Sequence, residues 1–158
     1  MKQILKFSSF FLLAILFLSG CNAIDEDEDL FKYKDSYVGD NSAVGNILNQ
    51  LQAAEFLKGF ELKTTEEPYG IVLNYEWTES KQNYKNTAIH NATFLFALIQ
   101  NVEWISFNFS NQEYKITKEQ LQNWYGKDLS ELQSEDEIKP FMQKHLADED
   151  KVNQLFVP

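Results

Sequence analysis

Arginine is absent from this chain of 158 residues, and its absence limits the partners that the chain can bind. All 14 basic residues are lysines, against 24 acidic residues, for a net charge of −10. Arginine is the usual side chain for bidentate contacts with phosphates and base edges. A surplus of negative charge also repels nucleic acids and anionic lipid head groups. We therefore expect no nucleic acid partner and no charge-driven binding to a membrane surface.

Cysteine and histidine are nearly absent too, which leaves few metal ligands. Cys21 is the single cysteine, so the chain has no internal disulfide and no cysteine-based zinc site. His90 and His145 do not form an H-E-x-x-H motif. We interpret His90 as a core or boundary residue of an apolar helix. His145 sits where a helix C-terminus favours a cation. We expect no metal site.

Motifs for catalysis are missing as well. The chain has no G-x-S-x-G or S-x-x-K motif for acyl transfer, and no glycine-rich phosphate loop. A pair of carboxylates could hydrolyse glycosides, but among 24 acidic residues some pair is always close. We therefore predict a protein that is not an enzyme and that binds no cofactor. A hydrolase is the weakest alternative.

No hydrophobic run is long enough to span a bilayer, which takes about 20 residues. The apolar stretch at residues 7–18 is shorter and follows Lys2 and Lys6, as in the first two regions of a signal peptide. The stretch ends in Leu18-Ser19-Gly20-Cys21, which resembles the lipobox of bacterial lipoproteins. That resemblance implies that Cys21 carries the lipid, palmitate among its acyl chains, and becomes the mature N-terminus. A secretory signal followed by an unrelated free thiol is the alternative.

Three regions follow from this interpretation. Residues 1–20 are a lipoprotein signal peptide, and residues 21–30 are an acidic linker after the lipidated Cys21. The linker lacks the glycine and the ligand spacing of a calcium loop, so we interpret it as solvated and self-repelling. Residues 31–158 are long enough to form one domain with its own core. Two acyl chains anchor a protein stably, which predicts a location on the outer face of the cell membrane.

The first half of the domain shows a helix and a hairpin. Asp40, Asn41 or Ser42 can cap a helix whose apolar stripe has helical spacing. That stripe consists of Val44, Ile47, Leu48 and Leu51. Residues 60–77 alternate as a β-hairpin around Pro68 and Gly70, which favour a turn.

The second half shows the main helix, two strands and short helices. After a polar loop at residues 78–85, residues 86–102 indicate a buried helix, followed by strands at residues 103–110 and 113–117. Capping signals at Thr117, Asp128 and Ser134 predict further helices, and Pro140 suggests that the last helix starts near Lys139. The fold class is α+β: a small antiparallel sheet of three to four strands with helices packed on one face.

Three residues make a tentative binding surface. We interpret most of the aromatic residues as core, with Tyr69 at the hairpin tip as the exception. Asp40 and Asn41 follow the loop that begins at Val38, at the start of a helix. They either cap that helix or mark an N-terminus whose free N–H groups hold an anion.

Two stretches resemble a known family. Tyr37-Val38-Gly39-Asp40-Asn41 and Glu67-Pro68-Tyr69-Gly70 are similar to an uncharacterised family of Gram-positive extracytoplasmic domains, domain of unknown function 4825, over about residues 31–126. The resemblance implies small lipoproteins, or domains attached to membrane-bound sensor metallopeptidases of the antibiotic-response type. It brings no catalytic residues, and the metallopeptidase part is absent from this sequence.

These features predict a lipid-anchored extracytoplasmic binding or sensing module. Its partners would be the membrane, through the N-terminal lipid, and an envelope protein or cell-wall component. The alternative is a lipoprotein that binds a small ligand or a glycan.

Overall fold

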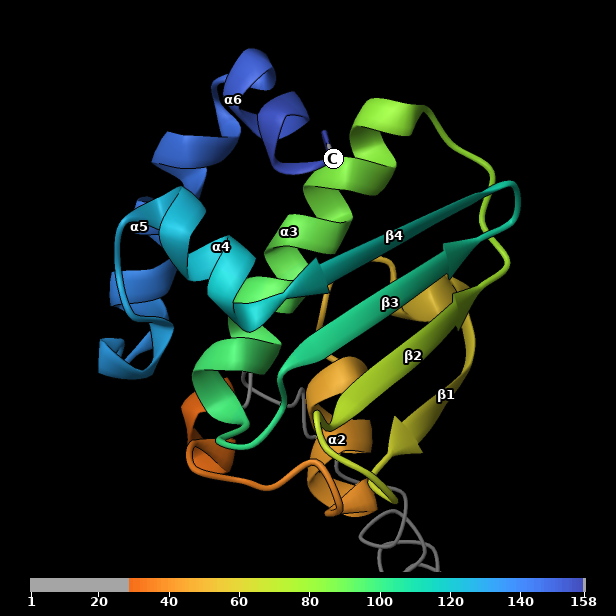
Figure 1. Ribbon diagram of the computed structural model, residues 1–158, viewed down its shortest axis with the longest axis vertical. Coiled ribbons are helices and arrows are strands. Elements are labelled where there is room, and N and C mark those ends of the chain that lie inside the picture. The colour runs from red at the N-terminus through yellow and green to blue at the C-terminus, as the bar shows by residue number, and fades with distance from the viewer. Residues whose placement is uncertain (1–28, 158) are drawn as a thin grey trace, which may run out of the picture.

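The computed structural model describes residues 29–157 (Figure 1). The predicted signal peptide, Cys21 and nearly all of the acidic linker lie outside these residues. None of the helices formed by residues 29–157 combines the length and the hydrophobicity that a membrane span requires. The elements are, in order, η1 (Leu30–Tyr33), α2 (Asn41–Leu48), η2 (Ala54–Phe56), β1 (Leu57–Lys63), β2 (Gly70–Tyr75), α3 (Lys81–Leu98), β3 (Trp104–Phe109), β4 (Gln112–Thr117), α4 (Lys118–Tyr125), η3 (Leu129–Glu131), α5 (Glu135–Leu146) and α6 (Glu149–Leu155).

The four strands form one sheet in the order β1-β2-β3-β4. The pairs β1–β2 and β3–β4 are antiparallel, whereas β2 and β3 are parallel and are joined through α3. Parallel neighbours need a long crossover, which the helix supplies. The α+β class with helices on one face of the sheet is confirmed (Figure 1). The sheet is mixed rather than wholly antiparallel, because the predicted buried helix connects its two hairpins.

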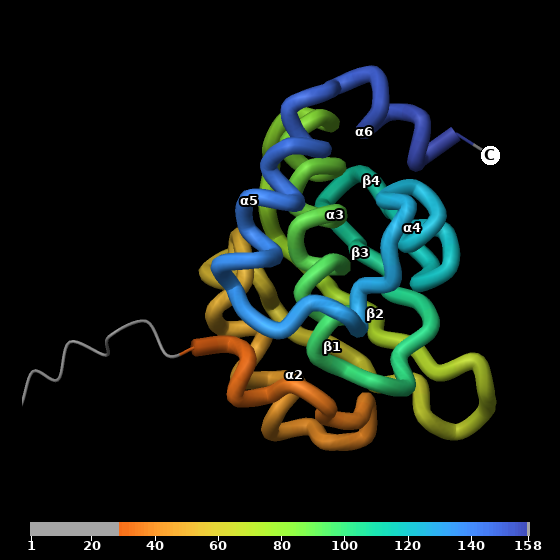
Figure 2. Tube along the Cα trace, turned by 90° about the vertical axis from the view of Figure 1, so that its left-hand side faces the viewer, coloured from red at the N-terminus to blue at the C-terminus, as the bar shows by residue number. Residues whose placement is uncertain are grey.

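Helix α3 forms the middle layer of the molecule. The sheet covers one side of it, and α5 lies on the other side (Figure 2). Twelve of its residues are buried, among them every residue from Asn91 to Leu98. The helix begins at Lys81 rather than after Asn86, because the Ser80 side chain accepts a hydrogen bond from Asn83 N at 3.2 Å. The polar residues of this first turn are the reason why the sequence predicts a loop over residues 78–85.

The strands bury one face against α3 and leave the other open. Ile71, Leu73, Ile105 and Phe107 are fully buried on the helix side. The outer face carries polar side chains such as Asn74 and Asn108, and no described helix lies over it (Figure 1). The aromatic residues near the hairpin close the core, as predicted. For example, the rings of Tyr84 and Phe109 stack with centroids 4.4 Å apart.

The capping signals locate the later helices, but one inference from proline was wrong. Thr117 and Gln120 form the predicted capping box of α4. Helix α5 begins at Glu135, not near Lys139, and contains Pro140. Ser134 accepts from Glu137 N at 3.3 Å and starts the helix despite the proline. Pro140 is exposed, so water can satisfy the carbonyl that its missing N–H leaves without a donor.

Candidate functional site

Two loops far apart in sequence meet at the lower end of the molecule as drawn in Figure 1, and the segment after α3 joins them. Val38 N donates a hydrogen bond to Asn101 Oδ1 at 2.8 Å. Glu103 N donates to Tyr69 O at 2.9 Å. We call this region the motif end. It consists of Tyr37, Val38, Gly39, Asp40, Asn41, Glu67, Pro68, Tyr69, Gly70, Asn101 and Glu103.

The loop before α2 is fixed by its backbone while it exposes a tyrosine. Ser36 N donates to Leu98 O at 3.1 Å, and Gln100 N donates to Ser36 O at 2.9 Å. Val38 is fully buried, whereas the side chain of Tyr37 is 57% exposed. Exposed aromatic side chains on a rigid backbone are well suited to binding because little conformational freedom is lost.

Asp40 and Asn41 start helix α2. The Asp40 side chain accepts from Ala43 N at 3.0 Å, and Asp40 O accepts from Val44 N at 3.0 Å. Asn41 is exposed, and its backbone N–H donates to Gly39 O at 3.1 Å. Asp40 therefore caps the helix, and Asn41 is its first residue. A carboxylate already occupies the helix N-terminus, so its charge opposes a second anion there.

The turn before β2 requires glycine at position 70. The indole ring of Trp104 lies across Gly70, and a Cβ added at Gly70 would lie 2.1 Å from Trp104 Cε2. The ring is held by a hydrogen bond from its Nε1 to Pro68 O at 2.8 Å. Lys115 Nζ lies 4.3 Å from the ring centroid. Gly70 and Trp104 together fix the direction in which the turn leaves the sheet.

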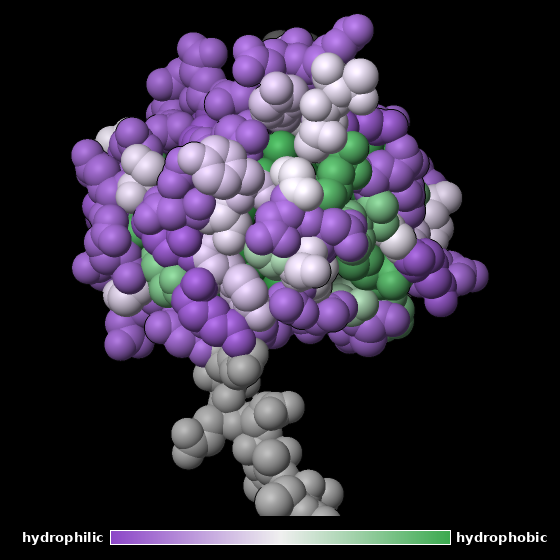
Figure 3. All heavy atoms as spheres, turned by 90° about the horizontal axis from the view of Figure 1, so that it is seen from below, coloured by the Kyte–Doolittle hydropathy of each residue, from purple (hydrophilic) through white to green (hydrophobic). Residues whose placement is uncertain are grey.

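An open hollow of about 400 Å³ lies at this turn, lined by Glu67, Pro68, Tyr69, Asn101 and Glu103. Tyr69 is half-buried, while Glu67 and Glu103 are exposed. The lining offers two carboxylates, a phenol and an amide, and none of its residues is a cation. Such a lining accepts hydrogen bonds and complements a basic or donor-rich group. Figure 3 looks at this end of the molecule and shows apolar side chains among the hydrophilic ones.

The segment before the Tyr37 loop is fastened by a lysine. Lys34 Nζ donates to Ala97 O, Ser130 O and Leu132 O at 3.0, 2.8 and 2.9 Å. Burial lowers the pKa of Lys34, although neighbouring Asp35 opposes the shift. These bonds join the start of the fold to the end of α3 and to the segment that contains η3.

Both histidine rings contact aromatic side chains of the fold. Nδ1 of His145 lies 2.8 Å from Phe141 O, and its ring packs against Trp124 and Tyr125. His90 contacts the ring of Phe94. In the part of the chain that the structure describes, no group of three or more His, Cys, Asp or Glu side chains could hold a metal ion.

Sequence reasoning identified some residues of the motif end and missed others. It selected Tyr69, Asp40 and Asn41, which lie in the two loops that the segment after α3 joins. It missed Asn101 and Glu103, which it assigned to the end of a helix and to the start of a strand. Their only signal was polarity on either side of buried Val102, and that pattern is too common to identify a site.

One comparison with known proteins agrees with the resemblance to domain of unknown function 4825. No curated protein and no solved structure matches the chain. One family model matches residues 30–119, described as Domain of unknown function (DUF4825). The match covers more than half of the chain and includes both loops of the motif end and all four strands. The chain belongs to the DUF4825 family.

Proposed function

We propose that this protein is a lipid-anchored, non-enzymatic binding or sensing module on the outer face of a Gram-positive cell membrane. Its partner is an envelope protein or a cell-wall component, which it binds with the motif end. The observation that carries the proposal is the convergence of the two family-like loops on Asn101 and Glu103.

The chemistry of the motif end supports a binding role. Tyr37 is exposed and Tyr69 lines the hollow, and tyrosines are common among the residues that dominate binding energy. Glu67 and Glu103 lie at the same hollow. A partner that presents lysine, arginine or amide donors would match these carboxylates, and charge complementarity would guide its approach.

The location rests on the sequence before the described residues. The lipobox-like stretch ends at Cys21, and the fold begins at Leu30, whose side chain is buried. An acidic, arginine-free chain gains nothing from anionic head groups, so the lipid itself has to supply the anchor. Metabolic labelling with a palmitate analogue tests this: the label should be lost in Cys21→Ala, and label that persists would refute the assignment.

The binding surface is tested by crosslinking and isolation from membranes. Tyr69→Ala should lose the partner, because it removes the aromatic wall of the hollow and leaves the backbone bond to Glu103 intact. Lys144→Ala, an exposed change on α5, is the matched control. Equal recovery of the same partner with Tyr69→Ala and wild type, at equal stability, would remove the hollow from the binding surface.

A further inference from the structure

A second cavity lies away from the motif end and shares none of its residues. Its volume is about 450 Å³, within the range of roughly 300–1,000 Å³ typical of small-molecule sites. Four segments far apart in sequence form it: the start of η1, the loop after α2, helix α3 and helix α5. The lining residues are Leu30, Asn49, Gln50, Leu51, Gln52, His90, Phe94, Glu135 and Lys139.

Apolar side chains form part of the cavity wall. Leu30 and Leu51 are each 5% exposed, and Phe94 is 1% exposed. With so little of these side chains open, the apolar wall offers only a narrow contact. The exposed part of the lining is polar and includes Asn49, Gln50 and Gln52.

Asn91 fixes both the loop and the histidine of the cavity. Its side chain accepts from Gln52 N at 3.1 Å and donates to Gln52 O at 2.9 Å. Because Gln52 O can only accept and Gln52 N can only donate, these two bonds identify Nδ2 as the donor side of the amide, and Nδ2 also lies 3.2 Å from Tyr75 Oη. Asn91 Oδ1 lies 3.0 Å from His90 Nδ1, so Nδ1 carries a proton. His90 Nε2 is then a hydrogen-bond acceptor.

The second nitrogen of His90 is open to the cavity. Among residues 29–157 no fully buried side-chain nitrogen or oxygen lacks a hydrogen-bond partner. His90 lines the cavity and its ring makes its hydrogen bond through Nδ1. Nε2 is therefore reached from the solvent side, where a ligand can donate to it.

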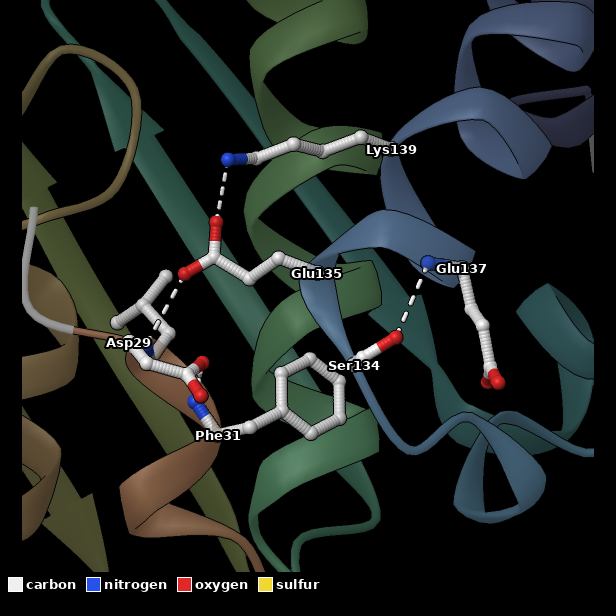
Figure 4. A network of polar contacts seen from close by, with 7 residues as sticks. Asp29, Phe31, Ser134, Glu135, Glu137 and Lys139 are labelled. Carbon is white, nitrogen blue, oxygen red and sulfur yellow. Dashed lines mark hydrogen bonds and ion pairs between the residues drawn. The ribbon is translucent and has the colours of Figure 1, made fainter.

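The charges of the cavity are balanced. Glu135 accepts from Leu30 N at 3.0 Å and pairs with Lys139 (Figure 4). Burial raises the pKa of Glu135, but the bonds from Lys139 and Leu30 N outweigh it and leave that pKa below its ordinary value. Burial lowers the pKa of His90, which keeps the ring neutral near pH 7. A charged ligand would lose hydration without meeting an unpaired opposite charge.

We infer that this cavity binds a small uncharged polyhydroxylated ligand, of the chemical class of a sugar. The ligand donates hydroxyl groups to His90 Nε2 and to the remaining acceptor positions of Glu135. The site is independent of the motif end. Either can exist without the other.

The test is an NMR titration of the full chain in micelles of an amine oxide detergent, which carries no sugar head group. The probes are glucose, galactose and N-acetylglucosamine as neutral sugars, with glucuronate and glucosamine as charged counterparts. We expect saturable shifts of the amide signals of Leu30, Gln52 and His90 with at least one neutral sugar. Each charged counterpart should bind at least about tenfold more weakly than the neutral sugar, or not at all.

Two variants separate the hydrogen bond from the shape of the site. His90→Phe keeps a ring but removes the acceptor, and it should weaken binding about tenfold, as expected for one lost hydrogen bond in a buried site. His90→Gln restores a polar group and should recover part of the affinity. Three results would overturn the inference: no saturable shift with any neutral sugar, equal binding of glucuronate, or shifts confined to the outer face around Trp104. The comparison of neutral and charged sugars on the wild-type chain decides the matter even where a variant fails to fold.

Discussion

Replacing Gly70 with alanine should destabilise the fold through one identifiable contact. The added Cβ would lie 2.1 Å from Trp104 Cε2, closer than any real carbon contact, so the indole ring has to move. Moving it breaks the bond from Trp104 Nε1 to Pro68 O and separates the ring from Lys115.

The size of the effect follows from these contacts. The lost hydrogen bond contributes about 1 kcal/mol. The cation–π contact at a partly exposed site contributes roughly 0.5–1 kcal/mol, and overpacking costs about 1–3 kcal/mol. Gly70→Ala should therefore lower the free energy of unfolding by about 2.5–5 kcal/mol, which corresponds to a fall in Tm of roughly 5–20 °C.

Urea denaturation followed by circular dichroism measures this difference. Gly39→Ala is the matched control, since an added Cβ there meets nothing within 4 Å, and its effect should stay within about 0.5 kcal/mol. The decisive comparison is Gly70→Ala in a Trp104→Ala background. With the ring removed, the alanine should cost less than about 1 kcal/mol. A cost as large as in the wild-type background would refute the reasoning.

Three further predictions concern buried or half-buried polar groups. Lys34→Met should lower the free energy of unfolding by about 2–4 kcal/mol in the same denaturation assay, because three carbonyls lose a charged donor. Lys144→Met, at an exposed position, is the control and should change it by less than about 0.5 kcal/mol. The pKa of His90, measured by NMR, should lie below the ordinary value of about 6.5; its contribution to stability is then present above that pH and is lost as the pH falls. His90→Phe should accordingly flatten the decline of stability as the pH falls below about 6.5, and a His90 pKa at or above its ordinary value would contradict this. Burial raises the pKa of Tyr75 to about 12. Tyr75→Phe should therefore leave the ultraviolet phenolate signal near pH 10 unchanged, and a reduced signal there would show that Tyr75 ionises at the ordinary pKa of a tyrosine.

The sequence was most informative where local signals and burial agreed. The capping box of Thr117 and Gln120 and the alternation of β2 and β3 predicted real elements, because capping and strand periodicity depend on neighbours in the chain. It failed where the deciding partner is remote. The parallel pairing of β2 and β3 depends on where α3 returns the chain, and nothing within either strand specifies it.

The candidate site shows the same division. Tyr69 and Asp40 could be selected because a turn and a helix start are local features. Asn101 could not, because its role is a hydrogen bond to Val38 across the fold. The cavity at His90 was out of reach for the same reason. Its histidine looks like an ordinary helix residue until Asn91 and Gln52 are seen together.

The most direct test of the motif end is a site-specific photo-crosslinking scan on intact membranes. A benzophenone side chain is placed in turn at Tyr37, Tyr69, Asn108 and Lys144, and the adducts are compared after irradiation. We predict one shared adduct from positions 37 and 69, and its absence from position 144 on α5 and position 108 on the outer sheet face. The same adduct from all four positions, or from position 108 or 144 alone, would contradict this prediction.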